Sequence, residues 1–554
     1  MTHPAKASHE AESGGFSARL RVDFTEANRD EALYEAGPVR LVMRLAGRTP
    51  GLEKYDEMSG NYLNFPLKDG ICPVIEATIC ERGGRVGIPL GALERADGIH
   101  DVTLDFTPPH WRISVDGVLD EDMPPSPDSI VWPDEPFRGK TLSTRVKSAE
   151  FFSPALAGAI PAAPDARRIV RSIQYWTPDD PDAWVGDVAI GSWCGRFHVF
   201  YLLDRRHHGS GGGAGRHFFA HVSSGDLANW DEHPPAVPIE EWWETLGTGT
   251  PFVHEDRLHL AYGLHTDRLT KDPSLPIGAT YASSEDGIHF AKSGVIVHPT
   301  QNPTIYNRQD GLLGLAAGYA GTGGLWTSDH LGDWRLYDGN IPARGDCPCP
   351  FEWNGHHYIL QGFTGFAHSA SGLSGTWEDW SKDGLAPYDG LSVPMVAPFD
   401  GNRRIMAGWL KYLDDRWGGW LVFRELLQNA DGTLGSKWVP EIVPPSPPLT
   451  FRVEAGRRFA CRFVRSDGCI SLVLAVDPAA REASFADDAQ GMAFDVPHNA
   501  GNFKIGGLRC VGGSYEVKVI VHYDPKAGAT VFDAEIGGER TIICRRTGRF
   551  VIEE

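Results

Sequence analysis

The stretch from Trp184 to Asp231 opens WVGDVAIGSWCGRFHVFYLLDRRHH (184–208) and closes HFFAHVSSGDLANWD (217–231). Its first part places an acidic residue, Asp187, at the entry to a pair of apolar strands. Its second part is a further strand followed by a turn of the form Ser-x-x-Asp-Leu-x-x-Trp. The stretch therefore predicts one antiparallel sheet whose first strand carries a carboxylate.

The turn in that stretch recurs along the chain as a small or hydroxyl pair, an acidic residue and then an aromatic residue. After SSGDLANW at 223–230 come SSEDGIHF at 283–290, TSDHLGDW at 327–334 and a looser copy, SGLSGTWEDW, at 371–380. Periods of about 45 residues are typical of β-propellers, in which each repeat is a four-stranded antiparallel blade. We predict that each copy is the turn between outer strands, with Asp or Ser capping backbone amides, and that about five blades fit the length.

The rest of the chain divides around this repeat region. Residues 1–15 are polar and predict a disordered tail, and 154–167 are rich in Ala and Pro, as in a linker. Alternation over 16–153 resembles the strand pairs of lectin-like β-sandwiches, and 445–554, which begin in a Pro-rich joint, predict a second β-sandwich. We therefore expect an all-β protein whose five-bladed propeller, residues 168–444, lies between two sandwiches.

The composition excludes several classes of function. The 554 residues are 41% hydrophobic and carry a formal charge of -21, which predicts a packed, acidic protein that binds neither nucleic acid nor a membrane surface. No apolar run reaches the ~20 residues of a membrane helix, and none follows the N-terminal basic residue as in a signal peptide. Nine cysteines without a repeated CxxC pair suggest reduced thiols and a cytoplasmic location. The sandwiches are where we would expect any homo-oligomer contact.

Hydrolysis of a glycoside requires two carboxyl groups whose environments push their pKa values apart. Asp187 is our candidate for the ionised group, with a turn that caps the strand entry as the structural alternative. Asp346, in ARGDCPCPFEWNGHHYIL (343–360), is the candidate acid, because the apolar residues that follow it would desolvate a carboxyl group. Its structural alternative is an ion pair with Arg344. Glu352 is the rival acid: it lies six positions on, so an extended strand would place both on one face.

Donor and aromatic side chains near these carboxylates are candidates for sugar contacts. The run DRRHH (204–208) supplies Arg205, Arg206, His207 and His208, which suit hydroxyls or an acidic substituent. The Gly-rich loop 209–215 lacks the context of a phosphate loop. His217 and His221 are four apart, which suits a metal only on a helix, so we predict neither metal nor cofactor and assign His221 to sugar contact or core. Trp243 is a candidate for stacking on the sugar, with core packing as its alternative.

These residues also support a resemblance. Residues 175–445 resemble the catalytic propeller of glycoside hydrolase family 32 (invertases, inulinases and levanases) and, more distantly, family 43. WVGDVAIGSWCGRFHVFYL resembles the segment Trp-x-Asn-Asp-Pro-Asn-Gly of the family, which implies that Asp187 is the nucleophile. GDCPCPF resembles the Glu-Cys-Pro-Asp segment, which implies that Asp346 is the acid/base. The resemblance extends to the Ser-Gly-Ser motif at Thr250, to Gly-Trp at Trp409 and to the C-terminal sandwich.

The chain departs from the family pattern at several positions. Gly186 and Val188 replace the Asn and Pro of the nucleophile segment, and the DRRHH run is not part of the invertase pattern. Gln301-Asn302-Pro303 is the match to Arg-Asp-Pro, so Asn302 brings no charge where the family has a transition-state contact, a loss of about 10²–10³ in rate. Asp310, in NRQDG (307–311), predicts a hairpin turn rather than a substitute.

The resemblance thus implies a retaining hydrolase of β-fructofuranosides or a related furanoside, with an oligosaccharide or small glycoside as substrate. Three alternatives stay open: an inverting arabinofuranosidase or galactofuranosidase like those of family 43, a fructosyl-transferring enzyme, and a sugar-binding propeller without catalysis.

Overall fold

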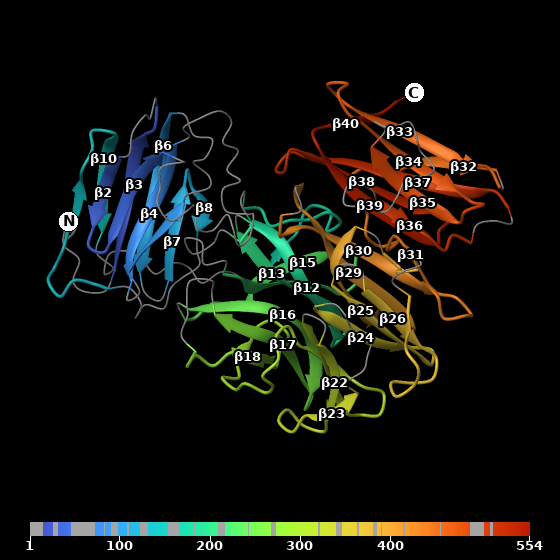
Figure 1. The fold of residues 1–554 in the computed structure, drawn as a ribbon. Helices are drawn as coiled ribbons and strands as arrows, with labels where there is room; N and C mark the ends of the chain where they lie inside the picture. The colour runs from blue at the N-terminus through green and yellow to red at the C-terminus, as the bar shows by residue number, and fades with distance from the viewer. Residues whose placement is uncertain are drawn as a thin grey trace, which may run out of the picture.

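The computed structural model describes residues 15–25, 31–45, 73–81, 84–89, 98–107, 110–121, 131–152, 165–180, 183–205, 207–208, 216–241, 243–266, 273–319, 322–338, 346–362, 365–380, 385–388, 390–413, 416–454, 456–487, 503–509 and 513–553. These residues form 40 β-strands and no α-helix, which confirms the all-β prediction (Figure 1). Within them, no helix is long and apolar enough to cross a membrane. The predicted tail, the Gly-rich loop and nearly all of the linker lie outside the described residues.

The N-terminal region consists of two five-stranded antiparallel sheets around one core. Its strands pack with alternate residues inward, as in β1, whose burial alternates along its length because only one face of the sheet meets the core. Phe16, Phe106 and Leu41 are among the residues that fill the space between the sheets. One sheet has the order β10 (Val146–Phe152), β1 (Phe16–Asp23), β6 (Ile99–Thr107), β7 (His110–Val115), β8 (Val118–Glu121), and the other the order β5 (Gly84–Pro89), β4 (Pro73–Glu81), β3 (Val39–Leu45), β2 (Glu31–Ala36), β9 (Gly139–Thr141).

The middle region contains five successive antiparallel units of four strands. The first unit and the fifth join into one larger sheet through the pairing of Val185 with Gly419, and the short strand β11 (Arg167–Arg168) extends the first. The units are β12 (Ala183–Trp193), β13 (Arg196–Arg205), β14 (Phe218–Ser224), β15 (Trp230–Val237); β16 (Glu244–His254), β17 (Arg257–Thr266), β18 (Gly278–Ser284), β19 (Ala291–Lys292); β20 (Thr304–Asn307), β21 (Leu313–Tyr319), β22 (Thr322–Ser328), β23 (Arg335–Asp338); β24 (Pro348–Trp353), β25 (His356–Gln361), β26 (Gly365–Ser369), β27 (Glu378–Asp379); and β28 (Leu391–Phe399), β29 (Arg403–Lys411), β30 (Gly419–Gln428), β31 (Leu434–Lys437).

The repeated motif forms the turn between the third and fourth strands of these units, as predicted. In the first copy Asp226 Oδ1 accepts hydrogen bonds from the amides of Ala228 (3.0 Å) and Asn229 (2.7 Å). In the second, Asp286 Oδ1 does the same for Ile288 and His289, both at 2.8 Å. The acidic residue of the motif is therefore a turn cap, and its role is structural.

The first strand of every unit faces one shared cavity. Its volume is about 270 Å³, and its lining includes Ile190 of β12, Thr250 of β16, Ile305 of β20, Phe351 of β24 and Val396 of β28. Side chains from these five strands therefore gather around a common space, although they are up to about 200 residues apart in the chain.

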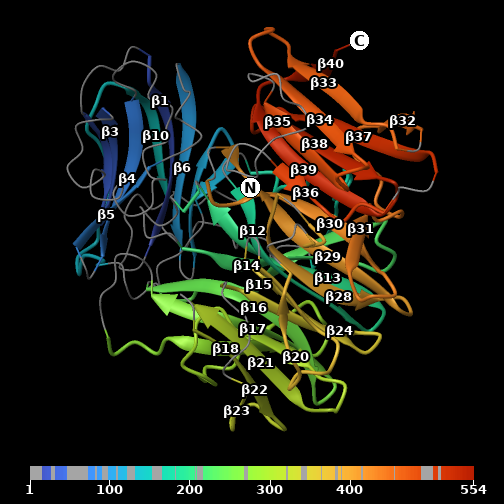
Figure 2. The same ribbon diagram turned by 45° about the vertical axis from the view of Figure 1, so that its right-hand side comes forward.

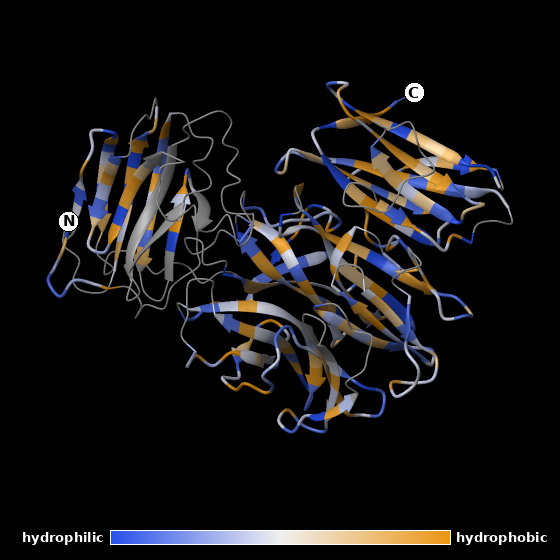
Figure 3. Cartoon of the chain, in the orientation of Figure 1, coloured by the Kyte–Doolittle hydropathy of each residue, from blue (hydrophilic) through white to orange (hydrophobic). Residues whose placement is uncertain are grey.

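The C-terminal region is a second pair of antiparallel sheets. One sheet packs on both faces: Val519 and Phe532 point into its own core, while Ile520, Val531 and Ile543 join the core of the middle region. Figures 1 and 2 show this sandwich lying over β30 and β31, and Figure 3 shows hydrophobic positions interleaved with hydrophilic ones along its strands. The sheets are β32 (Leu449–Val453), β37 (Tyr515–Asp524), β38 (Ala529–Ile536), β39 (Arg540–Thr547), and β36 (Phe503–Ile505), β35 (Glu482–Asp487), β34 (Ser471–Asp477), β33 (Phe459–Arg465), β40 (Phe550–Ile552).

Candidate active site

Two β-bulges place polar residues at the centre of the middle region. On β12 the pairing with β13 shifts register between Val185 and Val188, so Asp187 lies in the bulge. On β16 the register shifts between Gly247 and Gly249, which makes Thr248 the extra residue. A bulge turns a side chain away from the regular alternation of a strand and is common beside active sites. Both bulges therefore direct their polar residues toward one point, where Asp187 and Thr248 form a hydrogen bond.

Asp187 is buried among neutral hydrogen-bond donors. Its Oδ1 accepts from Trp409 Nε1 at 3.0 Å, and its Oδ2 accepts from Thr248 Oγ1. The Sγ of Cys347 lies 3.9 Å from Oδ2. Loss of solvation raises the pKa of Asp187, and the charge of Asp346 raises it further, while the hydrogen bonds from Thr248 and Trp409 lower it. Asp187 is thus a desolvated carboxyl group whose ionised form is held by two directed donors.

Asp346 is linked to Asp187 through Asn302. Asn302 Nδ2 donates to both carboxylate oxygens of Asp346 at 3.1 Å, and Asn302 Oδ1 accepts from the backbone amide of Thr248 at 3.2 Å. The amide of Cys347 donates to Asp346 Oδ1 at 2.9 Å. One chain of hydrogen bonds therefore runs from Asp187 through Thr248 and Asn302 to Asp346, and the two carboxyl groups meet at one site.

Two glycines make room for this arrangement. Gly247 and Gly263 are directly paired on β16 and β17. A Cβ at Gly247 would lie 2.4 Å from both Asn302 Oδ1 and His265 Nε2, and one at Gly263 would lie 2.6 Å from the same nitrogen. His265 hydrogen-bonds to Asn302, and burial lowers the pKa of His265. The two glycines therefore leave space for the His265 ring, and His265 in turn holds Asn302 next to Asp346.

Not all predicted contact residues reach this site. Trp409 does, through its bond to Asp187. His221 lies on β14 in a fully buried stack, with His198 Nδ1 3.0 Å from its Nε2. Burial keeps the pKa of His221 well below its usual value, and of the two alternatives, sugar contact or core, the core describes it. Thr250 Oγ1 donates to the carbonyl of Ile305 at 2.7 Å and serves to join β16 to β20.

The arginines and histidines of the DRRHH run separate in the structure. Arg205 is buried and donates to Asp180 Oδ2 at 3.2 Å. Arg206 lies outside the described residues. His207 donates from Nδ1 to the carbonyl of Trp417 (2.7 Å), while the His208 ring stacks on the Trp417 indole at 4.4 Å between centroids. Trp243 is buried, at 7% exposure. Of the described residues of this run, His207 and His208 therefore pack against the loop that follows β29, which contains Trp417.

Glu352, the rival acid, lies elsewhere. Strand β24 begins at Pro348, and Cys347 before it has a left-handed φ of 55°, so the alternation of an extended strand does not reach Asp346. The expectation that both residues share one strand face is therefore wrong. Glu352 pairs with His357 at 3.5 Å and lines the wider cavity. The predicted hairpin at Asp310 is confirmed, since its Oδ1 accepts from the amide of Leu312 (3.2 Å) in the turn between β20 and β21.

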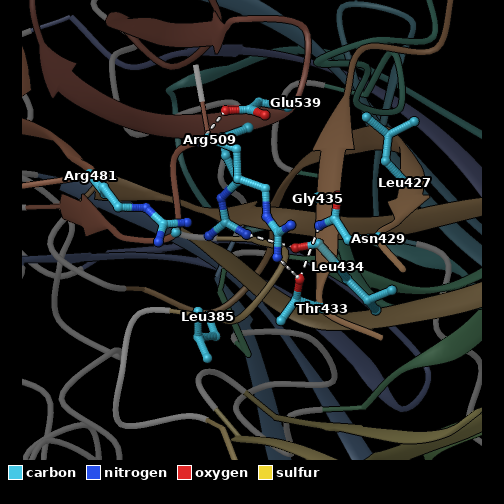
Figure 4. Close-up of a pocket in the computed structure, with 11 residues that line it drawn as sticks. Leu385, Leu427, Asn429, Thr433, Leu434, Gly435, Arg481, Arg509 and Glu539 are labelled. Carbon is cyan, nitrogen blue, oxygen red and sulfur yellow. Dashed lines mark hydrogen bonds between the residues drawn. The ribbon is translucent and has the colours of Figure 1, made fainter. Parts of the chain in front are cut away.

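A smaller pocket of about 50 Å³ lies between the middle region and the C-terminal sandwich (Figure 4). Arg509 in its wall donates to Asp431 Oδ2 (2.6 Å) and Thr433 Oγ1 (2.7 Å), and its amide bonds to Glu539. Arg481 donates to the carbonyl of Leu508 at 2.7 Å. The contacts of Arg509 fasten the two regions together, far along the chain from the carboxyl pair.

Three residues of the site were not predicted from sequence. Thr248 and Cys347 were adjacent to predicted positions, in the motifs at Thr250 and Asp346, but neither residue type suggested a contact with Asp187. His265 carries no local motif. Its only sequence signal is the glycine at position 263 on the same strand, which becomes meaningful once Gly247 is known to pair with it.

The comparisons with known proteins match the same part of the chain. Residues 181–345 match the model of the Glycosyl hydrolases family 32 N-terminal domain, a span that includes Asp187, Thr248 and Asn302 and ends one residue before Asp346. Over these residues the chain is similar to glycoside hydrolase family 32.

Among curated family 32 relatives, sucrose-6-phosphate hydrolase of Bacillus subtilis (strain 168) is 25% identical over 266 residues, which are 41% of this chain and 54% of that protein. Raffinose invertase of Escherichia coli is 24% identical over 316 residues, 47% of this chain and 63% of that protein. The chain thus spans only about half to under two thirds of these relatives.

Two solved structures of the family share the fold. The GH32 beta-fructofuranosidase of Bombyx mori superposes with a TM-score of 0.51 at 17% identity and covers 69% of this chain and 90% of its own. Exo-inulinase from Aspergillus awamori superposes with a TM-score of 0.50 at 14% identity and covers 68% and 93%. The all-β architecture of this chain therefore matches that of family 32 structures.

Proposed function

We propose that this protein hydrolyses β-fructofuranosides, or a closely related furanoside, with Asp187 and Asp346 as the catalytic pair. The observation that carries the proposal is the hydrogen-bonded chain that joins the two carboxyl groups through Thr248 and Asn302. Family 32 relatives named as sucrose-6-phosphate hydrolases and an invertase support the choice of sugar.

The architecture that we propose is a five-bladed β-propeller over residues 168–444. Its support is the succession of five four-stranded units whose first strands line one cavity. A lectin-like β-sandwich over 16–153, a linker over 154–167 and a C-terminal β-sandwich over 445–554 complete the proposed domains. In this arrangement carboxyl groups from two different blades converge on one sugar ring.

In the proposed reaction the ionised Asp187 attacks the anomeric carbon of the furanoside. Asp346 donates its proton to the glycosidic oxygen as that bond breaks, so the leaving alcohol departs neutral. Water then enters: Asp346 takes one of its protons, the oxygen attacks the anomeric carbon, and Asp187 leaves as a carboxylate. The anomeric configuration is retained. Asn302 orients the Asp346 carboxyl group in both steps through its two hydrogen bonds.

The second candidate is a sugar-binding propeller without turnover. Asn302 favours it, because this residue is uncharged and spends both of its polar atoms on protein partners, Asp346 and Thr248. A transition-state contact to the sugar would need one of these bonds to be exchanged.

The test is a panel of furanosides: sucrose, sucrose 6-phosphate, raffinose, inulin, levan, and aryl arabinofuranosides and galactofuranosides. Wild type and Asp187→Asn are incubated with each, and released sugar is measured. Release of fructose by the wild type alone supports the proposal. Release of arabinose or galactose would change the substrate but keep the carboxyl pair. If neither protein releases sugar while both bind it, the sugar-binding alternative replaces hydrolysis.

A further inference from the structure

Beside the candidate active site lies a buried carboxylate with an unsatisfied oxygen. Asp204, on β13, is fully buried. Its Oδ1 accepts from the backbone amide of His208 at 2.7 Å, while its Oδ2 has no hydrogen-bond partner among the described atoms. An ionised carboxylate in such a place is costly unless a cation compensates it. The groups around Asp204 therefore decide which cation could balance its charge.

Two imidazole nitrogens lie near the other oxygen of the same carboxyl group, Asp204 Oδ1. His208 Nδ1 and His217 Nε2 are 2.6 Å apart and lie 3.9 Å and 3.6 Å from Asp204 Oδ1. All three ligand atoms fall within 4.8 Å of one another. Ligands at about 2.0–2.2 Å around a tetrahedral zinc ion are about 3.3 Å from each other, so the observed separations bracket that value. Small side-chain rotations would bring the three atoms onto one ion.

The two rings are held from outside the cluster. The Trp417 indole stacks on both, with centroid separations of 4.4 Å to His208 and 4.5 Å to His217. Thr245 Oγ1 lies 3.5 Å from His217 Nδ1, the ring nitrogen that faces away from Asp204. Metal-binding histidines commonly have such a partner on the second nitrogen, which fixes the tautomer. His208 also has a left-handed φ of 72°, a strained conformation that recurs at functional sites.

Two departures from the family 32 pattern, Gly186 in place of Asn and the added DRRHH run, both contribute to this cluster. A Cβ at Gly186 would lie 2.0 Å from Trp417 Cη2, so Gly186, which replaces the Asn of the family, makes room for the indole. The DRRHH run supplies Asp204 and His208. Loss of the Asn and gain of the histidines therefore belong to the same local construction, one residue away from Asp187.

We propose that Asp204, His208 and His217 bind one divalent transition-metal ion. Zinc is the ion used to judge the geometry and to test the site. One carboxylate oxygen and two imidazole nitrogens form a ligand set for Zn²⁺ or Fe²⁺, whereas Ca²⁺ and Mg²⁺ prefer oxygen ligands. This inference replaces our sequence-based expectation of no metal. It does not rest on the proposed hydrolysis, because it concerns a cluster that shares no ligand with the carboxyl pair.

The experiment measures zinc retained by the full chain after equilibrium dialysis against Zn²⁺ and then against metal-free buffer. We expect one ion per chain for the wild type. His208→Gln and His217→Gln should each weaken zinc binding by more than about 100-fold, and Thr245→Val by about 10- to 100-fold. The control is His259→Gln on β17, whose ring Nε2 donates to the carbonyl of His254 at 3.0 Å, and it should keep the ion.

Two results would overturn the proposal. One is the absence of retained zinc in the wild type, in which case a proton shared between the two imidazoles balances Asp204. The other is equal retention by the wild type and by both ligand variants, which would place the ion elsewhere. Circular dichroism in the presence of a chelator shows whether each variant is folded. If His217→Gln does not fold, His208→Gln alone tests the site, because His208 is the more exposed of the two. The readout is independent of sugar cleavage.

Discussion

Two buried aspartates in this protein have the same side chain and nearly the same burial but opposite surroundings. Asp533, at the junction of the middle region with the C-terminal sandwich, receives a charged partner: Arg424 Nη2 donates to its Oδ1 at 2.8 Å, and the Tyr175 hydroxyl donates to its Oδ2 at 2.7 Å. Asp187 accepts its hydrogen bonds from Thr248 and Trp409, which are both neutral. Desolvation raises the pKa of both carboxyl groups.

Under the proposed function, the difference separates a structural carboxylate, Asp533, from the proposed nucleophile, Asp187. At Asp533 the guanidinium balances the charge, and Arg424 itself is tied to Thr541, so the pair joins two regions of the chain. At Asp187 the charge is held by directed dipoles only, and a neutral donor leaves the carboxylate able to attack an electrophile. We therefore expect substitution of Asp187 to lower the reaction rate more than stability, and substitution of Asp533 to lower stability more than the rate.

The largest effect that sharpens this contrast concerns the partner of Asp187. Asp346→Asn keeps the shape of the side chain but removes the proton donor, so kcat should fall by about 10²–10⁴-fold on sucrose-like substrates. The loss should be smaller on a nitrophenyl furanoside, whose leaving group needs little protonation. Glu352→Gln, at the rival carboxyl, is the control and should keep turnover. An equal loss on both substrates would contradict the role of Asp346 as an acid.

At the structural junction the expected effect is on stability. Asp533→Asn leaves the Arg424 guanidinium buried without its counter-charge, which should lower the free energy of unfolding by about 3–5 kcal/mol. The exposed pair of Arg546 with Asp487 (2.9 Å) offers the control, because Asp487→Asn should cost less than about 1 kcal/mol. Urea unfolding measures both. Similar small losses for the two variants would show that Asp533 contributes no more to the free energy of unfolding than an exposed ion pair does.

Asn302 tests whether orientation of the acid matters. Asn302→Ala removes both hydrogen bonds to Asp346 and should lower kcat/KM by about 10²-fold while changing the melting temperature little. Asn229→Ala, in the turn before β15, is the matched change at the surface and should leave kcat/KM unchanged. Full activity of Asn302→Ala would mean that Asp346 needs no positioning partner.

The smallest predicted effect is a shift of the pH profile. The Thr248 hydrogen bond lowers the pKa of Asp187 against the desolvation that raises it, so Thr248→Val should raise that pKa further. Because Asp187 must be ionised to attack, activity would then be lost at a higher pH on acidification. The acid limb of kcat/KM should therefore move upward. Thr280→Val, whose hydroxyl bonds to the carbonyl of Val295, is the control and should leave the limb in place.

The turns and strands could be predicted from sequence because they depend on residues that are close together in the chain. The capped turns at Asp226 and Asp286 depend on side chains two or three residues from the amides that they bind. The strands follow from alternation, which requires only that one face be buried. Strand β38 is buried on both faces, since it lies between two cores, and its surroundings follow from how the regions pack rather than from its own sequence.

The site was predicted only in part, because its geometry depends on contacts between distant strands. The residue pattern led to Asp187 and Asp346, and the resemblance led to Asn302 and Trp409. The structure gathers these four around one chain of hydrogen bonds. His221 stayed open between sugar contact and core, because a histidine on an alternating strand points inward or outward according to register, which sequence spacing near a turn does not resolve. Thr248 needed the bulge in β16, and bulges have no signature in a single sequence.

The comparison of the two aspartates is tested most directly by one variant, Asp187→Asn, measured for turnover and for melting temperature in the same preparation. We predict that turnover of the furanoside identified in the panel falls by more than about 10⁴-fold. We also predict that the melting temperature stays the same or rises, because a desolvated carboxyl group is replaced by a neutral amide of the same shape. Retained turnover, or a melting temperature that falls as far as that of Asp533→Asn, would contradict the assignment of Asp187 as the reactive carboxylate.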